Sequence, residues 1–219
     1  RVNYDYKSKY LLSLVLRRDG YSKLPKDNRW GTFPGISAGW VLSRENFMES
    51  CSNVLSYAKI RASYGANGNV SGVLDANGNV VTGLDYYTVQ GSYGIMKDKD
   101  GKIVPNYNGK VPLMINDLPN PTMRWEKSYT FETGFDIGFL NNKYILNFTY
   151  YNRHTQDKFA EITLPSHSGV SSFLSNNGEV QNQGMELELT ANVLRTKDWK
   201  FTVSMNTAYN KNKIISLPY

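Results

Sequence analysis

Carboxylate pairs are the residues of this sequence best suited to acid–base chemistry. Glu186 and Glu188 are two residues apart, and Glu132 and Asp136 are four apart, so each pair shares a face if its segment is a β-strand. Glycoside hydrolases use two carboxyl groups about 5–10 Å apart, and strand residues on one face can meet that distance. These faces also carry Thr, Asn and Lys, a pattern typical of a hydrated wall. We therefore predict a water-facing surface without catalytic residues, and a hydrolase remains an alternative.

The other reactive residue types do not form a recognisable site. His154 and His167 are thirteen residues apart, without the spacing of a metal motif or of a nucleophilic triad. The single cysteine, Cys51, excludes an internal disulfide and a thiolate cluster. Asp75–Asn79 begins like a calcium loop, but its glycine is fourth instead of sixth and its twelfth position is Tyr86. A hairpin turn is the better interpretation of that segment, and we predict no metal and no cofactor.

Composition indicates a folded chain rich in aromatic residues. Hydrophobic residues make up 40% and charged residues 20%, and there are 16 Tyr, 9 Phe and 4 Trp. Tyrosine at this density fits strands, carbohydrate-contacting surfaces and membrane-interface girdles. The net charge of +6 is spread along the chain, with no basic run longer than Arg17-Arg18, so we predict no nucleic-acid partner.

The elements that must position these residues are predicted to be strands, because polarity alternates with a period of two. In 128–139, for example, Tyr129, Phe131 and Phe135 alternate with Glu132 and Asp136. Seven segments show this pattern: 3–17, 32–43, 56–66, 128–139, 143–153, 185–193 and 199–210.

Connection lengths alternate between long and short along the chain. The long connections are 18–31, 67–124 and 155–179; the shorter ones are 44–55, with a short helix that Ser43 could cap, 141–142 and 196–198. Outer-membrane barrels have short periplasmic turns and long extracellular loops. We therefore predict an all-β fold, an antiparallel up-and-down transmembrane β-barrel portion of about seven strands, in which 67–124 adds no crossing.

Aromatic residues near the strand ends fit this prediction. Trp40, Tyr144 and Trp199 lie beside the short connections, and Tyr209 lies near a long one. We predict that these four contribute to membrane girdles, because amphipathic rings favour the headgroup level.

Tyrosines in the longest connection are candidates for binding. Tyr86, Tyr87, Tyr93 and Tyr107 could stack on a glycan or peptide and hydrogen-bond to it. Packing of the loop against itself or against a partner protein is the alternative interpretation.

Seven ordered segments resemble one known family: Arg17–Lys23, Asn28–Trp40, Glu45–Met48, Ala58–Asn69, Asn120–Lys127, Asn177–Glu186 and Asn210–Ile214. They are similar to the C-terminal barrel portion of SusC/RagA-type TonB-dependent outer-membrane transporters. The resemblance covers nearly the whole chain except 70–118.

This resemblance implies a barrel of 22 strands with an N-terminal plug and a SusD-like lipoprotein lid. It implies import of oligosaccharides or peptides, driven through the TonB complex, across the outer membrane of a Gram-negative bacterium, without enzymatic activity. Lid contact is a second possible role for the four loop tyrosines. We expect residues 1–219 to be part of a single barrel domain whose plug and N-terminal region are absent here. The alternative is a soluble β-sandwich carbohydrate-binding module.

Overall fold

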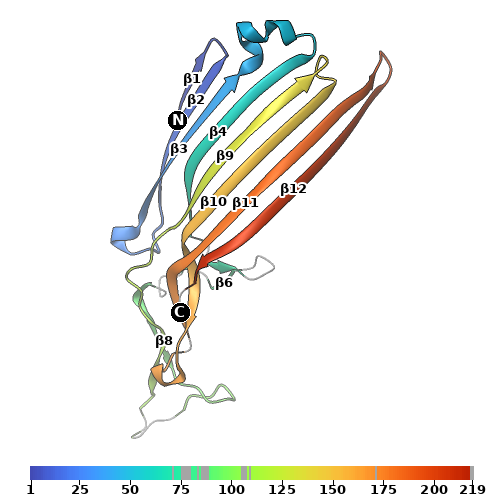
Figure 1. The fold of residues 1–219 in the computed structure, drawn as a ribbon. Coiled ribbons are helices and arrows are strands. Elements are labelled where there is room, and N and C mark those ends of the chain that lie inside the picture. The colour runs from blue at the N-terminus through green and yellow to red at the C-terminus, as the bar shows by residue number, and fades with distance from the viewer. Residues whose placement is uncertain are drawn as a thin grey trace.

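A computed structural model describes residues 1–70, 72–74, 80–82, 84, 89–104, 108, 110–170 and 172–217. Eight strands form one antiparallel sheet in the order β1-β2-β3-β4-β9-β10-β11-β12 (Figure 1). Their bounds are β1 Val2–Tyr6, β2 Tyr10–Gly20, β3 Trp30–Val41, β4 Leu55–Asn69, β9 Glu126–Phe139, β10 Tyr144–Thr163, β11 Ser172–Arg195 and β12 Lys200–Ser216. Because these strands make one sheet and not two packed sheets, the β-sandwich alternative is wrong.

Smaller elements lie in the connections. The short strands are β5 (Val73–Leu74), which pairs with β6 (Val80–Thr82), and β7 (Ser92–Ile95), which pairs with β8 (Leu113–Asp117). The 3₁₀ helices are η1 (Lys26–Asn28), η2 (Leu42–Arg44), η3 (Asn46–Cys51) and η5 (Ser166–Ser168). None of the helices in the described residues has the length and apolar character needed to cross a membrane.

The longest connection adds no strand to the main sheet. β4 pairs directly with β9, with Ser63 opposite Glu132 and Ala62 opposite Thr133. The prediction that 67–124 contributes no crossing is therefore confirmed for the eight-stranded sheet.

The first predicted strand, 3–17, is in fact a hairpin, which makes the count eight and not seven. Lys7 and Ser8 both have φ near 53° and turn the chain, so that Tyr6 lies opposite Tyr10. Residues opposite one another share a face. Because Tyr6 and Tyr10 differ by an even number, the alternation of faces continues unbroken through the turn and hides it.

The short turn after β9 forms where the sequence predicts it. Leu140, Asn141 and Asn142 have φ of 50°, 56° and 58°, and asparagine tolerates this left-handed region. The turn at 196–198 is also confirmed, because Thr196 N donates to Trp199 O at 2.8 Å and Trp199 N donates to Thr196 Oγ1 at 3.0 Å.

Two connections differ from prediction. Most of 155–179 is strand, because β10 continues to Thr163 and β11 begins at Ser172. Register shifts on both sides of Lys158, with Asp157 at φ 56°, break the alternation that would have revealed these extensions. The helix in 44–55 is 3₁₀, and η3 starts after Glu45 without a side-chain cap, so Ser43 caps nothing.

The sheet has one apolar and one polar face. One row across the strands is apolar: Tyr10, Trp40, Ile60, Phe135, Phe148 and Leu187. A row three positions further along, on the other face, is polar: Ser13, Ser37, Ser63, Glu132 and Tyr151. Leu146, Phe148 and Leu187 keep partial exposure and Phe201 is exposed, so the apolar face is not sealed inside a globule.

The short turns occupy one end of the sheet, and each successive turn lies further along the strand direction than the one before. Tyr10, next to the first turn, lies in the row of Phe148. Tyr144, next to the second turn, is four residues further out (148 − 144) and pairs with Ala191. The third turn closes at Arg195, another four residues beyond Ala191 (195 − 191).

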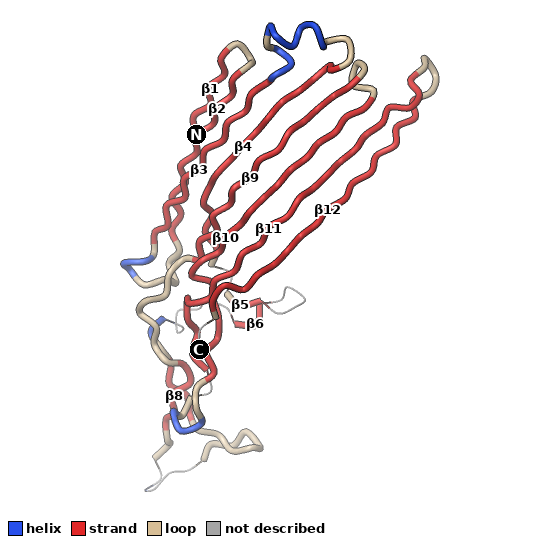
Figure 2. The backbone as a smooth tube through the Cα atoms, in the orientation of Figure 1, coloured by secondary structure: helices blue, strands red, loops and turns tan. Residues whose placement is uncertain are grey.

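The buried core lies at the opposite end, where the long connections gather (Figure 2). Its members are Leu24, Phe33, Leu84, Met123, Trp125, Phe159 and Leu174, from segments far apart in the chain. The described residues therefore bury their apolar side chains around the loops more than between layers.

Candidate functional site: the polar face and the long-loop end

Arg61 organises the polar face of the sheet. From β4 it reaches across β9, so that Nη2 donates to Thr149 Oγ1 at 2.5 Å and Nε lies 3.4 Å from Asp136 Oδ1. Gly134 stands between them in the register, and a Cβ there would come within 3.3 Å of the guanidinium and 2.2 Å of Phe148 O. The glycine therefore leaves the space through which Arg61 crosses to β10.

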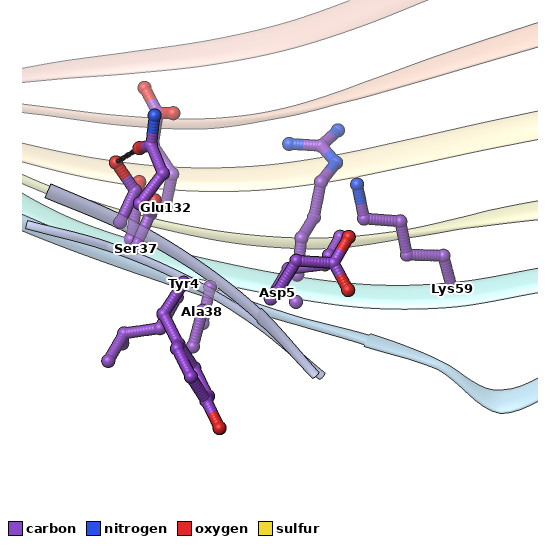
Figure 3. Close-up of a pocket in the computed structure, with 14 residues that line it drawn as sticks. Tyr4, Asp5, Ser37, Ala38, Lys59 and Glu132 are labelled. Carbon is purple, nitrogen blue, oxygen red and sulfur yellow. Dashed lines mark hydrogen bonds between the residues drawn. The ribbon is translucent and has the colours of Figure 1, made fainter. Parts of the chain in front are cut away.

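A hollow lined in part by Arg61 lies on β1 to β4, and Glu132 of β9 also lines it (Figure 3). Lys59 and Glu132 point to the polar side, whereas Tyr4 and Ala38 point to the opposite side. The small side chains of Ser13, Ser37 and Ser63 form the polar side of this hollow. Such a surface offers charged and hydroxyl groups to water or to a polar solute.

The four predicted carboxylates all lie on this polar face. Asp136 pairs with Arg61, and Glu188 Oε2 accepts from Asn147 Nδ2 at 3.3 Å. Glu186 and Glu188 are exposed on the open sheet, opposite Thr149 and Asn147. Among the described residues, no group of three or more His, Cys, Asp or Glu side chains could hold a metal ion. The arrangement is a polar wall of the sheet, and its contact with water stays a prediction.

At the long-loop end, residues 120–126 connect several elements. Asn120 is 5% exposed; its Nδ2 donates to Leu174 O at 2.9 Å, and its Oδ1 accepts from Thr122 N at 3.1 Å. Asn176, 4% exposed, donates through Nδ2 to Arg124 O at 2.9 Å and to Asp157 O at 2.8 Å. These amides tie the start of β9 to the extensions of β10 and β11.

Arg124 holds the bulge in β10. Its Nη2 lies 2.6 Å from Asp157 Oδ1, and this hydrogen bond raises the pKa of Arg124 above its usual value. Asp157 is the residue with φ 56°, a conformation that aspartate adopts more readily than most residues. The ion pair therefore stabilises the point at which β10 changes register.

Glu126 is a buried carboxylate with partners on both oxygens. It is 2% exposed; Oε1 accepts from Phe159 N at 2.7 Å, and Oε2 accepts from Asn69 Nδ2 at 2.8 Å. Lys158 Nζ lies 3.8 Å from Oε1. Because buried charges are costly unless paired and hydrogen-bonded, this set of partners is what permits Glu126 at this position.

Trp125 and Phe33 form the aromatic centre of the same end. Their rings lie 5.5 Å apart at 68°, and Trp125 Nε1 donates to Arg29 O at 3.2 Å. A Cβ on Gly68 would lie 2.1 Å from Phe33 Cζ, so only glycine leaves room for the ring. We call Asn120–Glu126 with Phe33, Asn69, Asp157 and Asn176 the outer-end hub.

Sequence reasoning singled out the segments of the hub but assigned them no role. Asn28–Trp40, Ala58–Asn69 and Asn120–Lys127 converge here although they are far apart in the chain. The available signal was the density of Asn, Gly, Trp and charged residues at predicted strand ends.

The short-turn end has its own polar contacts. Glu45 accepts from Trp40 Nε1 at 3.1 Å and from Lys9 Nζ at 3.0 Å. These hydrogen bonds, the one from Trp40 above all, lower the pKa of Glu45. Arg44 Nη1 donates to Ser8 O at 3.1 Å. Together these residues hold the first turn against η2.

The predicted girdle residues lie at strand ends. Trp40 stacks on Tyr10 at 6.3 Å, Tyr144 lies under Lys143 Nζ at 5.8 Å, and Trp199 is 74% exposed beside its turn. Tyr209, 62% exposed, is nearer the other end, opposite Met185. Their role in a membrane stays a prediction.

Only one of the four predicted contact tyrosines can be placed. Tyr93 lies on β7 and is 74% exposed. Tyr86, Tyr87 and Tyr107 lie outside the described residues, as does the Asp75–Asn79 segment. Substrate or lid contact by these residues stays a prediction.

The chain is similar to known outer-membrane receptors. Residues 1–217 match the family model described as TonB dependent receptor-like, beta-barrel. The chain is 34% identical to TonB-dependent receptor P3 of Formosa agariphila, with 100% of the chain aligned. It is 33% identical to TonB-dependent receptor SusC of Bacteroides thetaiotaomicron, with 99% aligned. The chain spans 20% of the length of each of these relatives.

Solved structures agree with the sheet. The RagAB peptide importer in its closed-closed state superposes on 99% of the chain with a TM-score of 0.80 and 25% identity, over 22% of that structure's chain. The siderophore receptor PirA of Pseudomonas aeruginosa aligns with 97% of the chain and 33% of its own, with a TM-score of 0.58 and 16% identity, a likeness of fold alone.

Proposed function

Because the chain belongs to the β-barrel family of TonB-dependent receptors, we propose that it forms part of the wall of an outer-membrane importer in a Gram-negative bacterium. Residues 1–219 would belong to a single barrel domain. The names of two related proteins, SusC and the RagAB peptide importer, support oligosaccharides or peptides as the imported class. The relatives are named as receptors, and we expect no enzymatic activity from this chain.

The sorting of side chains onto two faces is the observation that carries this proposal. A barrel strand in a bilayer must present apolar residues to lipid and can present polar residues to an aqueous lumen. The apolar face, with Phe148, Leu187 and Leu189, would contact lipid. The face with Arg61 and Glu132 would contact water and solute in the lumen.

The position of the long loops at one end of the sheet supports contact with substrate or a lid at that end. Short turns mark the periplasmic end of such barrels and long loops the extracellular end. The β7–β8 hairpin at the long-loop end exposes Tyr93 (74%) and Leu113 (69%), which suits contact with substrate or with a SusD-like lipoprotein lid. Energy from the TonB complex would act through parts of the protein outside this chain.

A pair of adjacent substitutions in the full transporter tests the wall. Asn147 and Phe148 are neighbours on β10 and lie on opposite faces, and Phe148 is four residues from the girdle residue Tyr144. Lysine on a lipid-facing strand costs up to about 2–4 kcal/mol, most in the middle of the bilayer, whereas a lumen position tolerates charge. We expect Phe148→Lys to reduce the amount of folded protein in the outer membrane strongly and Asn147→Lys to leave it near the parent level, as measured by membrane fractionation.

The outcome that contradicts the proposal is equal tolerance of both substitutions, or recovery of the parent protein without detergent. Uptake of labelled oligosaccharides and of labelled peptides by cells carrying the parent and Asn147→Lys proteins would then separate the two substrate classes. Uptake of neither class by the parent would count against import.

A further inference from the structure

Strand β12 sorts its cations to one side at the long-loop end. Its sequence there is Asn210, Lys211, Asn212 and Lys213. Asn210 lies opposite Gly184 in a row of the polar face, so the two lysines project from the other side of the sheet, the side of Tyr209. The two asparagines therefore lie on the lumen side of the proposed wall, and the two lysines lie on its outward side.

Amide residues of β11 lie opposite the two lysines. Lys211 lies opposite Gln183 and Lys213 opposite Gln181, and Gln183 in turn lies opposite Asn152. Gln181 Nε2 donates to Asn152 Oδ1 at 2.9 Å. We call Lys211, Lys213, Gln181, Gln183 and Asn152 the outward cationic patch.

The patch begins where the apolar band of this part of the sheet ends. The row before it consists of Tyr150, Met185 and Tyr209, and the last two are 47% and 62% exposed. The row of Lys211 follows directly on the side of the long loops. In a barrel, acyl chains would cover the apolar row, and lipid head groups would lie at the level of the patch.

The ion pairs of the described residues leave out both lysines of the patch. Among the residues that the structure describes, neither Lys211 nor Lys213 forms a salt bridge. Glu179, two residues from Gln181, lies 2.7 Å from His154 Nε2 instead. Within the described part of the chain, the two ammonium groups therefore have no carboxylate as an ion-pair partner.

We propose that the outward cationic patch binds the phosphorylated head group of a lipid in the outer leaflet. Same-face residues two apart on a strand are about 7 Å apart, so two ammonium groups can reach oxygens of one phosphate or of two phosphates on one head group. Charge-assisted hydrogen bonds to phosphate are strong, and the amides can bond to neighbouring head-group oxygens. This inference rests on the proposed membrane function, because only a bilayer brings lipid to this face.

The test uses the full transporter, purified in mild detergent, with Lys211→Gln and Lys213→Gln combined. The matched control combines Lys143→Gln and Lys197→Gln, which remove two positive charges at the short-turn end. Each protein is titrated with a phosphorylated glycolipid, with the same glycolipid after dephosphorylation, and with inorganic phosphate, and binding is followed as a shift in Tm. We expect the affinity of the patch variant for the phosphorylated lipid to fall on the order of tenfold to thirtyfold, as for two surface charges, and that of the control to stay unchanged.

Each result decides one point. Equal affinity of the parent and the patch variant, or equal binding of the dephosphorylated lipid, would overturn the phosphate assignment. An equal response to inorganic phosphate would assign the patch to free anions and overturn the lipid assignment. A parent protein found outside the membrane would refute the proposed function itself, whereas a membrane-embedded protein without these lipid effects would refute only this inference.

Discussion

At the scale of single residues, the outer-end hub explains why its segments contain the residue types they do. Asn120 bonds to β11, Arg124 to β10, and Glu126 to both β10 and β4, and Trp125 packs beside Phe33. Each of these side chains combines a buried position with a specific donor or acceptor. A substitution that preserves the size of one of these side chains would therefore still lose a hydrogen bond.

Glu126 gives the sharpest residue-scale prediction. Replacing it with alanine leaves Phe159 N–H buried without its acceptor, and we expect a loss of about 2–4 kcal/mol in the free energy of unfolding. Glu126→Gln keeps one acceptor oxygen and should lose less. Glu186→Ala, at an exposed site, is the control and should change stability by less than about 0.5 kcal/mol. Denaturant unfolding in detergent measures all three, and equal effects at 126 and 186 would refute the hub.

Gly68 gives a prediction about space. Gly68→Ala would place a methyl group against Phe33, and we expect a cost of about 1–3 kcal/mol from overpacking. Gly35→Ala is the matched control, because its nearest contact would be 3.9 Å. Adding Phe33→Leu to Gly68→Ala should restore part of the loss. Failure of that rescue, with Gly35→Ala equally harmful, would mean that backbone flexibility and not the ring governs this site.

At the scale of elements, the first hairpin depends on polar contacts outside the sheet. Val41 N donates to Lys9 O at 2.8 Å. Beyond the end of β3, Arg44 bonds to Ser8 and Glu45 to Lys9. β1 has only five residues and pairs only with β2 in the described sheet. The stability of this hairpin should therefore follow the charge of Glu45.

That dependence predicts a pH effect. Since the pKa of Glu45 is lowered in the folded protein, its stabilising contribution is complete above the ordinary glutamate pKa and is lost as pH falls through the lowered value. Hydrogen exchange at Val41 N–H, corrected for intrinsic rates, should therefore show less protection at about pH 3 than at about pH 6. Glu45→Gln should remove this pH dependence, and an unchanged profile in that variant would assign the effect to other groups.

At the scale of the whole molecule, periodicity predicts the sheet well and the hub poorly. Strands with one apolar and one polar face, such as β9, can be recognised in the sequence because consecutive residues lie in different surroundings, as Phe135 and Asp136 do. Periodicity does not reveal the Lys7–Ser8 turn, because the alternation of faces continues through it. It does not reveal the β10 extension either, because the irregularity at Asp157 interrupts the alternation. The hub unites residues such as Asn69 and Glu126 that are close only after folding, and no local pattern encodes that contact.

The stepped register of the short turns carries a consequence for the complete barrel. The turns stay along one edge in Figure 1 while the strands run obliquely to it, and the offset grows in the same direction from the first turn to the third. The offset accumulated around a closed barrel is its shear, and shear and strand number together set the inclination of the strands and the diameter of the barrel. Inserting or deleting one residue in a single wall strand would move its inward-facing residues to the outer face and would break the register with its neighbours. Insertions in the long loops would leave the barrel diameter unchanged.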